Sequence, residues 1–502
     1  MKEDRVECTL GRVFKIVSGS TPKGLKEVSA DGEIPFYKVS DMNHKGNEVF
    51  MKKSNIYLSE SDFENLKLKL YPKGTVIFPK RGGAILTNKK RVLFQNSCFD
   101  LNLMGVLPNE FVEDKYLFFW FQKLDLCSIY DGSNVPQINN KNIFPLSFPL
   151  SPLIEQQAIV KKIEELFSSL ESGIADLKKA QDQLKIYRQA VLKKAFEGEL
   201  TKEWREKQTE LPTAEELLME IKKERQKHYE QQLAKWKEAI IAWENNGKEG
   251  KKPGKPGKIK EFELNEIEEL PIIPNSWAWE KLGNVCLKIM DGTHFSPKNI
   301  EKGDFKYITA KNIKEGRIDL RNISYVTQED HEAIFDRCDV KKGDVLYIKD
   351  GATTGRAAVN TLEEEFSLLS SVGVFRTIKS FINPKFLESF LNAQVTRNRM
   401  LSNIAGVAIT RLTLVKLNNS MFSLCSVEEQ HQIVQEIESR LSVCDAVEQN
   451  IQDSLEKAQA LRQSILKKAF EGTLLSDKEI AKCKAHPDYE PASVLLERIK
   501  KG

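Results

Sequence analysis

Residues 155–198 read EQQAIVKKIEELFSSLESGIADLKKAQDQLKIYRQAVLKKAFEG, and residues 429–472 read EQHQIVQEIESRLSVCDAVEQNIQDSLEKAQALRQSILKKAFEG. The two copies are offset by 429 − 155 = 274 positions, with no insertion or deletion between them. Solenoid repeats have periods of roughly 20–50 residues, so this much longer period indicates duplication of a whole module. The sequence therefore predicts a chain in which a globular part followed by a long helix occurs twice.

Each copy carries a heptad pattern, in which seam positions recur at alternating intervals of four and three residues. The seam positions of the first copy are Ile163, Phe167, Leu170, Ile174, Leu177, Gln181, Leu184, Arg188 and Val191. Those of the second copy are Ile437, Leu441, Cys444, Glu448, Ile451, Leu455, Ala458, Arg462 and Ile465. A helix through residues 153–197 would be roughly 67 Å long, and Gly198 and Gly472 are typical helix stop signals. We expect the two helices to pack on each other, with unlike seam residues fixing their register.

Weaker echoes relate the parts of the chain that precede the two helices. LGRVFKIVSGSTPK at residues 10–23 parallels LGNVCLKIMDGTHFSPK at residues 282–298. KGTVIFPKRGG at residues 73–83 parallels KGDVLYIKDGATTG at residues 342–355. Each segment is a short β-branched or aromatic run closed by turn residues, as in a strand followed by a turn. We therefore expect two strand-rich modules and an α+β fold.

The expected organisation alternates modules with helices. It comprises a first module at residues 1–150, a long helix at 151–200, a charged helix and linker at 201–260, a second module at 261–424, a second long helix at 425–473 and a C-terminal tail helix at 474–502. The linker sequence NNGKEGKKPGKPGK at residues 245–258 is rich in Gly, Pro and Lys, which favours a solvated tether. A dedicated DNA contact is the weaker alternative for this linker.

Composition limits the class of protein. Lys and Arg outnumber Asp and Glu by 21 − 17 = 4 in residues 1–149, and by the same 21 − 17 = 4 in residues 277–424. The eight cysteines include no CxxC pair, so we expect reduced thiols rather than disulfides or structural zinc. The start MKEDRVECTL has no apolar run, and no stretch reaches the roughly 18 apolar residues of a membrane span. We expect a soluble intracellular protein.

Catalytic motifs are absent from the sequence. GATTGR at residues 351–356 has too few spacer residues for a phosphate-binding loop and lacks the Lys-Ser/Thr end. An Asn-Pro-Pro-Tyr-like motif of amino-methyltransferases is also missing. Asp291, Asp304 and Lys306 are spaced loosely like a metal-dependent nuclease centre, but the first module has no counterpart. We therefore expect a protein that is not an enzyme, with the nuclease as the weaker alternative.

DNA binding accounts better for the charge pattern. Residues 65–99 hold eight basic side chains and no acidic one, interleaved with Tyr71, Phe78 and Phe94, as neutralisation of phosphates requires. The candidate DNA-binding residues of the first module are Lys80, Arg81, Lys89, Lys90, Arg91, Ser133, Asn134, Gln137 and Asn139. A solvated strand face and ordinary turn chemistry are the alternatives for these residues.

The candidates of the second module are sparser. They are Thr293, His294, Lys311, Asn312, Lys349, Thr353, Thr354, Arg356 and Arg411. Among side chains, Asn and Gln pair bidentately with adenine, and Arg pairs with guanine. Both modules therefore offer side chains suited to phosphates and side chains suited to base edges.

Taken together, these motifs resemble the specificity subunit of type I restriction-modification systems. The resemblance rests on EQQAIV and EQHQIV, on VLKKAFEG and ILKKAFEG, and on LPTAEELLMEIKKER at residues 211–225, and it covers nearly the whole chain. It implies two target-recognition domains, each reading one half of a bipartite, asymmetric DNA sequence. It also implies that the long helices pack as an antiparallel coiled coil that sets the spacing of the half-sites.

The resemblance further implies the partners of the chain. These are double-stranded DNA, two modification subunits that methylate adenine N6 with S-adenosylmethionine, and restriction subunits that use ATP and Mg. It implies no catalytic residue, no cofactor and no metal in this chain, and a prokaryotic, cytoplasmic protein. The alternative function is a coiled-coil scaffold whose modules bind proteins, against which the positive charge of both modules argues.

Overall fold

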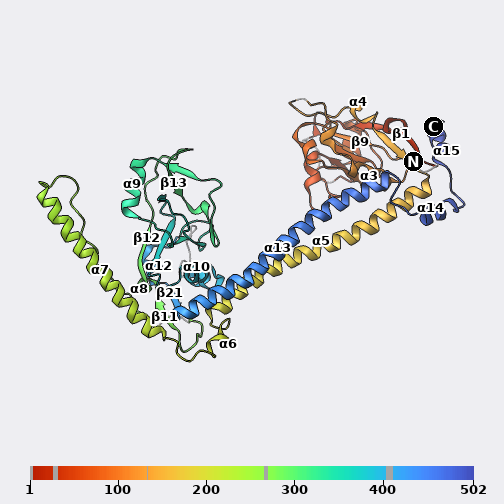
Figure 1. Cartoon of the computed structure of the whole chain (residues 1–502). Helices are drawn as coiled ribbons and strands as arrows, with labels where there is room; N and C mark the ends of the chain where they lie inside the picture. The colour runs from red at the N-terminus through yellow and green to blue at the C-terminus, as the bar shows by residue number, and fades with distance from the viewer. Residues whose placement is uncertain (1–3, 26–31, 133, 265–269, 403–410, 502) are drawn as a thin grey trace. The chain divides into compact units, whose positions relative to one another are not determined.

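The computed structural model describes the chain except for residues 1–3, 26–31, 133, 265–269, 403–410 and 502. The chain forms two compact units: residues 1–179 with 451–502, and residues 180–450. Two 44-residue helices, α5 (Leu153–Phe196) and α13 (Val427–Phe470), each contribute one part to the first unit and the other part to the second (Figure 1). Strand-rich sheets with two long helices confirm the expected α+β class. No helix among the described residues is long and apolar enough to cross a membrane.

The long helices are antiparallel in both units. In the first unit, the start of α5 shares a core with the end of α13, and the Arg462 guanidinium lies 4.3 Å from the centre of the Phe167 ring. In the second unit, the end of α5 shares a core with the start of α13, and Arg188 pairs with Asp445 and Glu448 at 2.6 and 3.0 Å. The predicted seam positions are buried or half-buried except Glu448, which is exposed because its carboxylate reaches Arg188 across the seam.

The described residues of the first module form three sheets. β1 (Val6–Thr9) pairs antiparallel with β10 (Ser147–Leu150), at the entrance to α5. The five-stranded sheet has the order β2 (Ile16–Ser18), β9 (Leu103–Val106), β6 (Val76–Pro79), β7 (Arg91–Leu93) and β4 (Phe50–Met51). The three-stranded sheet has the order β5 (Tyr57–Leu58), β3 (Ile34–Tyr37) and β8 (Cys98–Phe99).

The second module repeats this plan. β11 (Ala278–Lys281) pairs antiparallel with β21 (Met421–Leu424), at the entrance to α13. The four-stranded sheet has the order β12 (Cys286–Asp291), β20 (Val372–Thr377), β17 (Val345–Ile348) and β18 (Ala357–Val359). The three-stranded sheet has the order β16 (Ser324–Val326), β13 (Phe305–Ile308) and β19 (Phe366–Leu368). The duplication seen in the long helices therefore extends to the modules.

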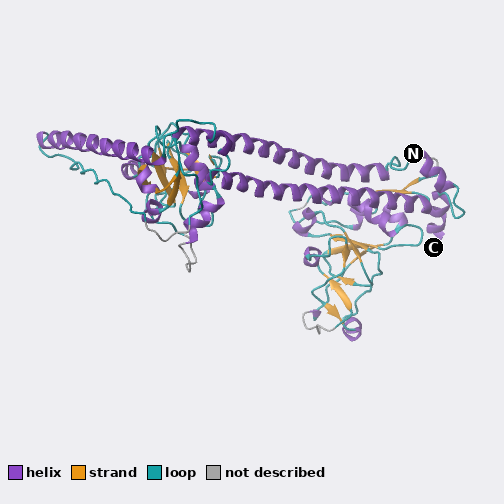
Figure 2. Ribbon diagram, turned by 90° about the horizontal axis from the view of Figure 1, so that it is seen from below, coloured by secondary structure: helices purple, strands orange, loops and turns teal. Residues whose placement is uncertain are grey.

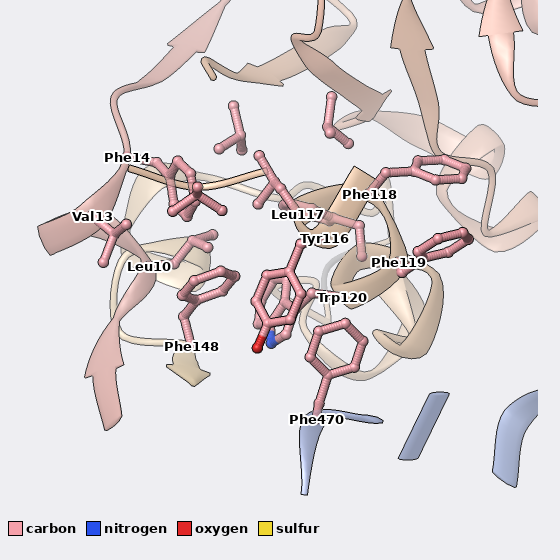
Figure 3. Close-up of a cluster of buried hydrophobic side chains, with 14 of the residues drawn as sticks. Leu10, Val13, Phe14, Tyr116, Leu117, Phe118, Phe119, Trp120, Phe148 and Phe470 are labelled. Carbon is pink, nitrogen blue, oxygen red and sulfur yellow. The ribbon is translucent and has the colours of Figure 1, made fainter. Parts of the chain in front are cut away.

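An aromatic helix attaches each module to the long helices. In the first unit this helix is α3 (Asp114–Lys123), whose Tyr116 ring packs on Phe148 of β10 and on Phe470 of α13 (Figure 3). In the second unit it is α10 (Pro384–Asn392), which packs on Phe196 of α5. Burying such aromatic side chains is worth about 1.5–3 kcal/mol each. Each module is thus seated on both long helices by apolar packing.

A buried glutamine at the start of each long helix adds polar specificity to this seating. Gln156 accepts a hydrogen bond from the Glu113 N–H at 2.9 Å, and its amide donates to the Ser151 carbonyl at 2.8 Å. Gln430 makes the same bonds to the equivalent groups of the second unit. A buried amide whose hydrogen bonds are satisfied fixes one geometry, because any other leaves a polar group unpaired. The Gln of the repeated Glu-Gln pair therefore locks each module to its helix.

The neighbouring glutamate is also buried and paired. In the second unit, Glu429 is 1% exposed, and its carboxylate accepts hydrogen bonds from Arg205 at 2.5 Å, Thr201 at 2.7 Å and Trp277 at 2.8 Å. These donors come from the segments that follow α5 and precede β11. A carboxylate without such donors is costly to bury. Glu429 therefore holds together three stretches of chain that are distant in sequence.

The segment after the first long helix differs from the expected tether. α7 (Ala214–Asn245) is followed by residues 246–260, which form neither helix nor strand. The indole of Trp236 donates to the Pro253 carbonyl at 3.1 Å, and that of Trp243 donates to the Gly250 carbonyl at 3.2 Å. The predicted solvated tether is therefore exposed, as expected, but it is bound along α7. A pattern of Gly, Pro and Lys alone does not reveal this, because the binding groups lie on α7.

The C-terminal tail forms two helices where the sequence predicts one. They are α14 (Asp477–Lys484) and α15 (Ala492–Lys501), and both contribute to the core of the first unit. The Ala492 N–H donates to the carbonyl of Asp4 at 3.1 Å. The N-terminal segment and the tail therefore lie side by side.

Breaking the buried glutamate cluster tests its role in the second unit. We expect Arg205→Ala to lower the free energy of unfolding by about 3 kcal/mol, because it leaves Glu429 buried and short of a cation. The measurement is urea denaturation followed by tryptophan fluorescence, to which Trp277 beside Glu429 contributes. The matched control is Arg440→Ala, whose exposed pair with Glu436 on the same helix system is worth about 0.5 kcal/mol or less. Equal effects of the two substitutions would contradict the assignment.

Candidate nucleic-acid interface

Four segments of the second module meet at one edge of its four-stranded sheet. The Lys349 N–H, just after β17, donates to the Ser371 carbonyl before β20 at 2.9 Å, and the Leu412 N–H donates to the Lys349 carbonyl at 2.8 Å. The Ser370 N–H donates to the Thr293 carbonyl, just after β12, at 2.8 Å. We call this edge the second rim: residues 291–294, 349–356, 369–371 and 411–412. It brings together candidates that lie more than a hundred residues apart in sequence.

The candidates of the second module differ in exposure. His294, Lys311 and Arg411 are exposed, and Thr353 and Arg356 are half-buried. Thr293, Asn312, Lys349 and Thr354 are buried. Asn312 uses its amide to bind the Asp319 carbonyl at 3.0 Å, and the Thr354 hydroxyl binds the Gly351 carbonyl at 2.6 Å. The buried polar residues thus shape the loops, and the exposed ones are the residues able to reach a ligand.

Lys349 belongs to the core of the rim. Its side chain is 2% exposed, and its ammonium lies 3.2 Å from the carboxylate of Asp291, which is 4% exposed. Arg337 and His294 also contact this carboxylate, at 3.1 and 3.4 Å. A buried cation that is paired in this way supports the loops and does not reach phosphates. The predicted role of Lys349 in DNA contact therefore does not fit its buried side chain.

The first module has an equivalent edge. The Lys80 N–H, just after β6, donates to the Asn102 carbonyl at 2.8 Å, and the Ile138 N–H donates to the Lys80 carbonyl at 2.9 Å. The Gly82 N–H donates to the Pro136 carbonyl at 2.8 Å. We call this edge the first rim: residues 18–21, 80–83, 100–102 and 134–138. The bond from Ile138 to Lys80 matches the bond from Leu412 to Lys349.

The candidates of the first module are mostly accessible. Arg81, Asn134 and Asn139 are exposed, and Lys80, Lys89, Arg91 and Gln137 are half-buried. Lys90 is buried, and Ser133 lies outside the described residues. The Lys80 ammonium donates to the Ser18 hydroxyl at 2.8 Å. Burial and the neighbouring charge of Arg81 lower the pKa of Lys80, which an approaching phosphate would raise again.

Lys90 serves the fold of the first module. Its ammonium donates to the Asn88 side chain at 2.7 Å and to the Leu124 carbonyl at 2.6 Å, and burial lowers its pKa to about 8. The aromatic residues interleaved with the basic stretch also lie inward: Tyr71 and Phe78 are buried, and only Phe94 is exposed. The basic character of residues 65–99 therefore overstates the charge that faces solvent.

A matched bridge shows how the two rims differ. Arg81 pairs with Gln137 as an isolated β-bridge in the first rim, and Asp350 pairs with Arg411 in the second. The Arg411 guanidinium also contacts the Asp350 carboxylate at 3.4 Å. The backbone is thus alike in the two rims, whereas the cation has moved from one side of the bridge to the other. The two rims present different side chains at equivalent positions.

Sequence reasoning missed residues 18–21 of the first rim. Gly19 and Gly292 occupy equivalent places, where a Cβ would lie 2.1 Å from the Asp100 and Leu368 carbonyl oxygens, so only glycine allows the backbone to approach so closely. The Leu101 N–H donates to the Thr21 hydroxyl at 3.2 Å. The signal in the sequence is the similarity of GST at residues 19–21 to DGTH at residues 291–294, which contains two candidates of the second module.

The nuclease alternative gains no support. The carboxylate of Asp291 is bound by cations, and Lys306 pairs with Glu364 at 2.7 Å on β13. Within the described part of the chain, no group of three or more His, Cys, Asp and Glu side chains is arranged to hold a metal ion. All eight cysteines are unpaired.

The pH dependence of stability tests the burial of Lys90. Because its pKa falls from 10.5 to about 8 on folding, the unfolded chain binds one more proton between these pH values, and stability rises with pH there. We expect Lys90→Met to remove up to about 3 kcal/mol of this rise, measured by urea denaturation from pH 8 to pH 10. The exposed Lys45→Met is the control. If Lys90→Met kept the full rise, the ammonium of Lys90 in the natural chain would have to be exposed to solvent.

Comparison with known proteins identifies a family and relatives that are similar to this chain. The sequence profile of the family described as "Type I restriction modification DNA specificity domain" matches residues 2–179 and 274–457. The EcoBI specificity subunit of Escherichia coli is 26% identical over 404 residues, covering 78% of this chain and 73% of that protein. The EcoDI specificity subunit of Escherichia coli is 27% identical over 383 residues, covering 74% and 71%. Relatives named as specificity subunits confirm the expectation that the chain is not an enzyme.

Solved structures share the fold. A chain from a study of assembly and conformational transition of the type I R-M system has a TM-score of 0.61 at 17% identity, covering 94% of this chain and 98% of that one. The HsdS subunit from Thermoanaerobacter tengcongensis has a TM-score of 0.50 at 17% identity, with the same coverage. The matched profile spans both modules and most of both long helices. The chain therefore belongs to the family of type I restriction-modification DNA specificity proteins.

Proposed function

We propose that this chain is the specificity subunit that selects the DNA target of a type I restriction-modification complex, with each rim reading one half of a bipartite sequence. The observation that carries the proposal is the pair of equivalent rims with unlike side chains. The two bridges have equivalent backbones, but the first rim carries Arg81 and Gln137 there and the second carries Asp350 and Arg411. Such a difference suits two half-sites of different sequence. A homodimer of identical readers would instead favour a palindromic target.

The accessible candidates divide into two roles. Arg81 in the first rim, and Lys89 and Lys311 outside the two rims, carry charge and suit phosphates, which fix the position of a protein on DNA without reading it. Gln137 and Arg411 lie at the bridge in the middle of the rims and suit base edges. We assign base reading to these two positions and phosphate contact to the charged residues around them.

The long helices act as the spacer in this proposal. Within each unit they pack antiparallel along a seam of mostly buried and half-buried residues, which is the packing expected of a coiled-coil spacer. Duplex DNA presents equivalent groove faces about 34 Å apart, one helical turn. A 44-residue helix of about 66 Å is long enough to carry two modules at that separation. Helix length would then set the gap between half-sites.

The surface of the long helices offers docking points for modification subunits. Tyr187 on α5 and Leu461 on α13 are 46% and 50% exposed, and they occupy equivalent repeat positions, since 461 − 187 = 274. Exposed apolar side chains at matched positions suit two copies of one partner. In this proposal the partners supply methyl transfer with S-adenosylmethionine and restriction with ATP and Mg, while this chain supplies neither.

Substitution within the two rims tests the division of labour. We expect Arg411→Gln to relax one base position of one half-site by about 1–3 kcal/mol and to leave the other half-site unchanged. Gln137→Ala should act only on the opposite half-site. The measurement is methylome sequencing of cells carrying each variant with its modification subunit. Arg440→Gln, on the exposed surface of α13, is the control. A variant that alters both half-sites would contradict the assignment of one rim to each half-site.

Lengthening the spacer gives an independent test. We expect insertion of one heptad after Ala180 of α5, matched by one after Asp453 of α13, to keep the seam in register and to add about 10.5 Å. The unspecified gap in the methylated sequence should grow by about three base pairs, with both half-sites unchanged. Altered half-site bases, or an unchanged gap, would show that the helices do not set the spacing.

A further inference from the structure

α7 and residues 246–260 form a structure that the reading of two half-sites does not use. Figure 2 shows the loop after α7 running back beside the helix. Two indoles of α7 hold this loop through its backbone, with Trp236 bound to the Pro253 carbonyl and Trp243 to the Gly250 carbonyl. We call α7 with residues 246–260 the basic arm. Its return segment is fixed by specific hydrogen bonds.

The two hydrogen bonds join a helix to an extended segment at intervals that cover similar distances. Trp236 and Trp243 are seven residues apart on α7, which corresponds to about 10.5 Å along the helix. Their acceptors, Pro253 and Gly250, are three residues apart in an extended chain, which corresponds to about 9.3 Å in a polyproline II conformation. The repeat KPGKPGK at residues 252–258 favours that conformation because proline fixes φ. The seven-residue interval on α7 and the three-residue interval on the return segment therefore cover similar distances, so both hydrogen bonds can form.

This match holds the lysines of the repeat along one line. The ammonium of Lys252 lies 5.7 Å from the centre of the Trp243 ring, and that of Lys255 lies 5.6 Å from the centre of the Trp236 ring. Lys258 follows after the same interval, and all three are exposed. Residues 250–260 contain five lysines and no acidic residue. Residues 250–260 thus present regularly spaced charges of one sign, whereas the rest of the arm, with Glu249 and the glutamates of α7, is mixed in charge.

The base of the arm is also positive. A pocket of about 580 Å³ lies between α7, the return segment and the second module, and its cationic lining includes Arg225, Lys258 and Arg376. His228 lines the same pocket, and burial, followed by the charge of Arg376, lowers its pKa. Arg376 is itself paired with Asp339 and Asp344, but Lys258 pairs with no carboxylate among the described residues. The line of charge therefore continues to the module.

A protein partner fits this surface poorly. Interfaces between proteins are anchored by buried aromatic side chains, and lysine is depleted in their cores. The two indoles of the arm are half-buried and bound to its own return segment, and the lysines and glycines of residues 250–258 are exposed. Met219 and Ile241 of α7 are the exposed large apolar side chains of the arm, and the return segment offers a regular line of lysines, which suits non-specific binding to a polyphosphate backbone.

We propose that the basic arm binds the phosphate backbone of duplex DNA next to the half-site read by the second module, without reading sequence. The proposal rests on the proposed function only in placing DNA at the second module. Trp236 and Trp243 act as positioning residues, because they order the lysines before DNA arrives and so reduce the entropy lost on binding. Lys252, Lys255 and Lys258 make the contacts.

Charge removal from the return segment tests the proposal. The full chain is titrated onto a fluorescent duplex of random sequence between about 50 and 200 mM salt, so that no target needs to be known. We expect the triple variant K252Q/K255Q/K258Q to bind more weakly at low salt. The slope of log K against log salt should fall by up to about 2.7, or about 0.9 for each phosphate that the variant no longer neutralises.

The matched control is K222Q/K223Q/K227Q, which removes three exposed lysines from α7 itself. Lys223 and Lys227 already pair with Glu220 and Glu224, so we expect the slope to stay near that of the natural chain. An unchanged slope in K252Q/K255Q/K258Q, or an equal fall in both variants, would overturn the proposal. So would unchanged DNA binding together with weaker association of the modification subunit, since the arm would then bind an acidic protein surface.

Loosening the arm without removing charge gives a second test. In the double variant W236A/W243A, we expect faster hydrogen exchange and proteolysis within residues 250–260, with the salt slope retained and affinity reduced by about tenfold or less. Natural affinity in this variant would show that the indoles do not order the lysines for DNA. Methylome sequencing separates the two proposals: arm variants should keep both half-sites, whereas failure of the chain to direct methylation would refute the proposed function and leave the arm intact.

Discussion

The structure depends on the buried Glu-Gln pair that begins each long helix. The glutamine side chain fills its hydrogen bonds with backbone groups of the module, and the glutamate is held by an arginine, Arg5 for Glu155 and Arg205 for Glu429. Because an unpaired buried polar group is costly, only one orientation of the helix relative to its own module satisfies both residues. Apolar packing of α3 and α10 supplies the attraction, and the polar pair supplies the geometry. A rim carried by such a module keeps a fixed relation to the helix that begins beneath it.

Much of this organisation was predictable because periodic patterns survive in sequence. The seam from Ile163 to Val191 and its second copy identified the contact face of both helices, since burial follows the heptad along a regular helix. Glu448 alone is exposed, and its pairing with Arg188 needs the partner helix to be known. The strand-rich modules were also predictable in kind, whereas the pairing of β6 with β9 or of β17 with β20 depends on contacts far apart in sequence, which no local pattern encodes.

The candidate site was harder to predict because charge does not report burial. Lys90 and Lys349 have the residue type of a phosphate contact, yet one is held by carbonyl groups and the other by Asp291. Tyr71 and Phe78 have the residue type of nucleic-acid stacking but belong to the core. Turn residues such as Gln137 lie in the first rim, because turns lie on the surface where loops meet. Whether they touch bases stays a prediction.

In the proposed function, a DNA-binding arm on one unit would make the two halves of the chain unequal in affinity for DNA as well as in sequence preference. Phosphate contacts strengthen binding at every sequence, and base contacts discriminate among sequences. An arm that belongs to the second unit would add affinity beside one proposed half-site only, and the other half-site would rely on its own rim. Raising the salt concentration weakens the arm first, because its contacts are purely electrostatic. Binding at the two half-sites would then depend differently on salt. At low salt the second module would hold DNA while the first module tests its half-site. At higher salt both half-sites would have to match their modules before the complex persists.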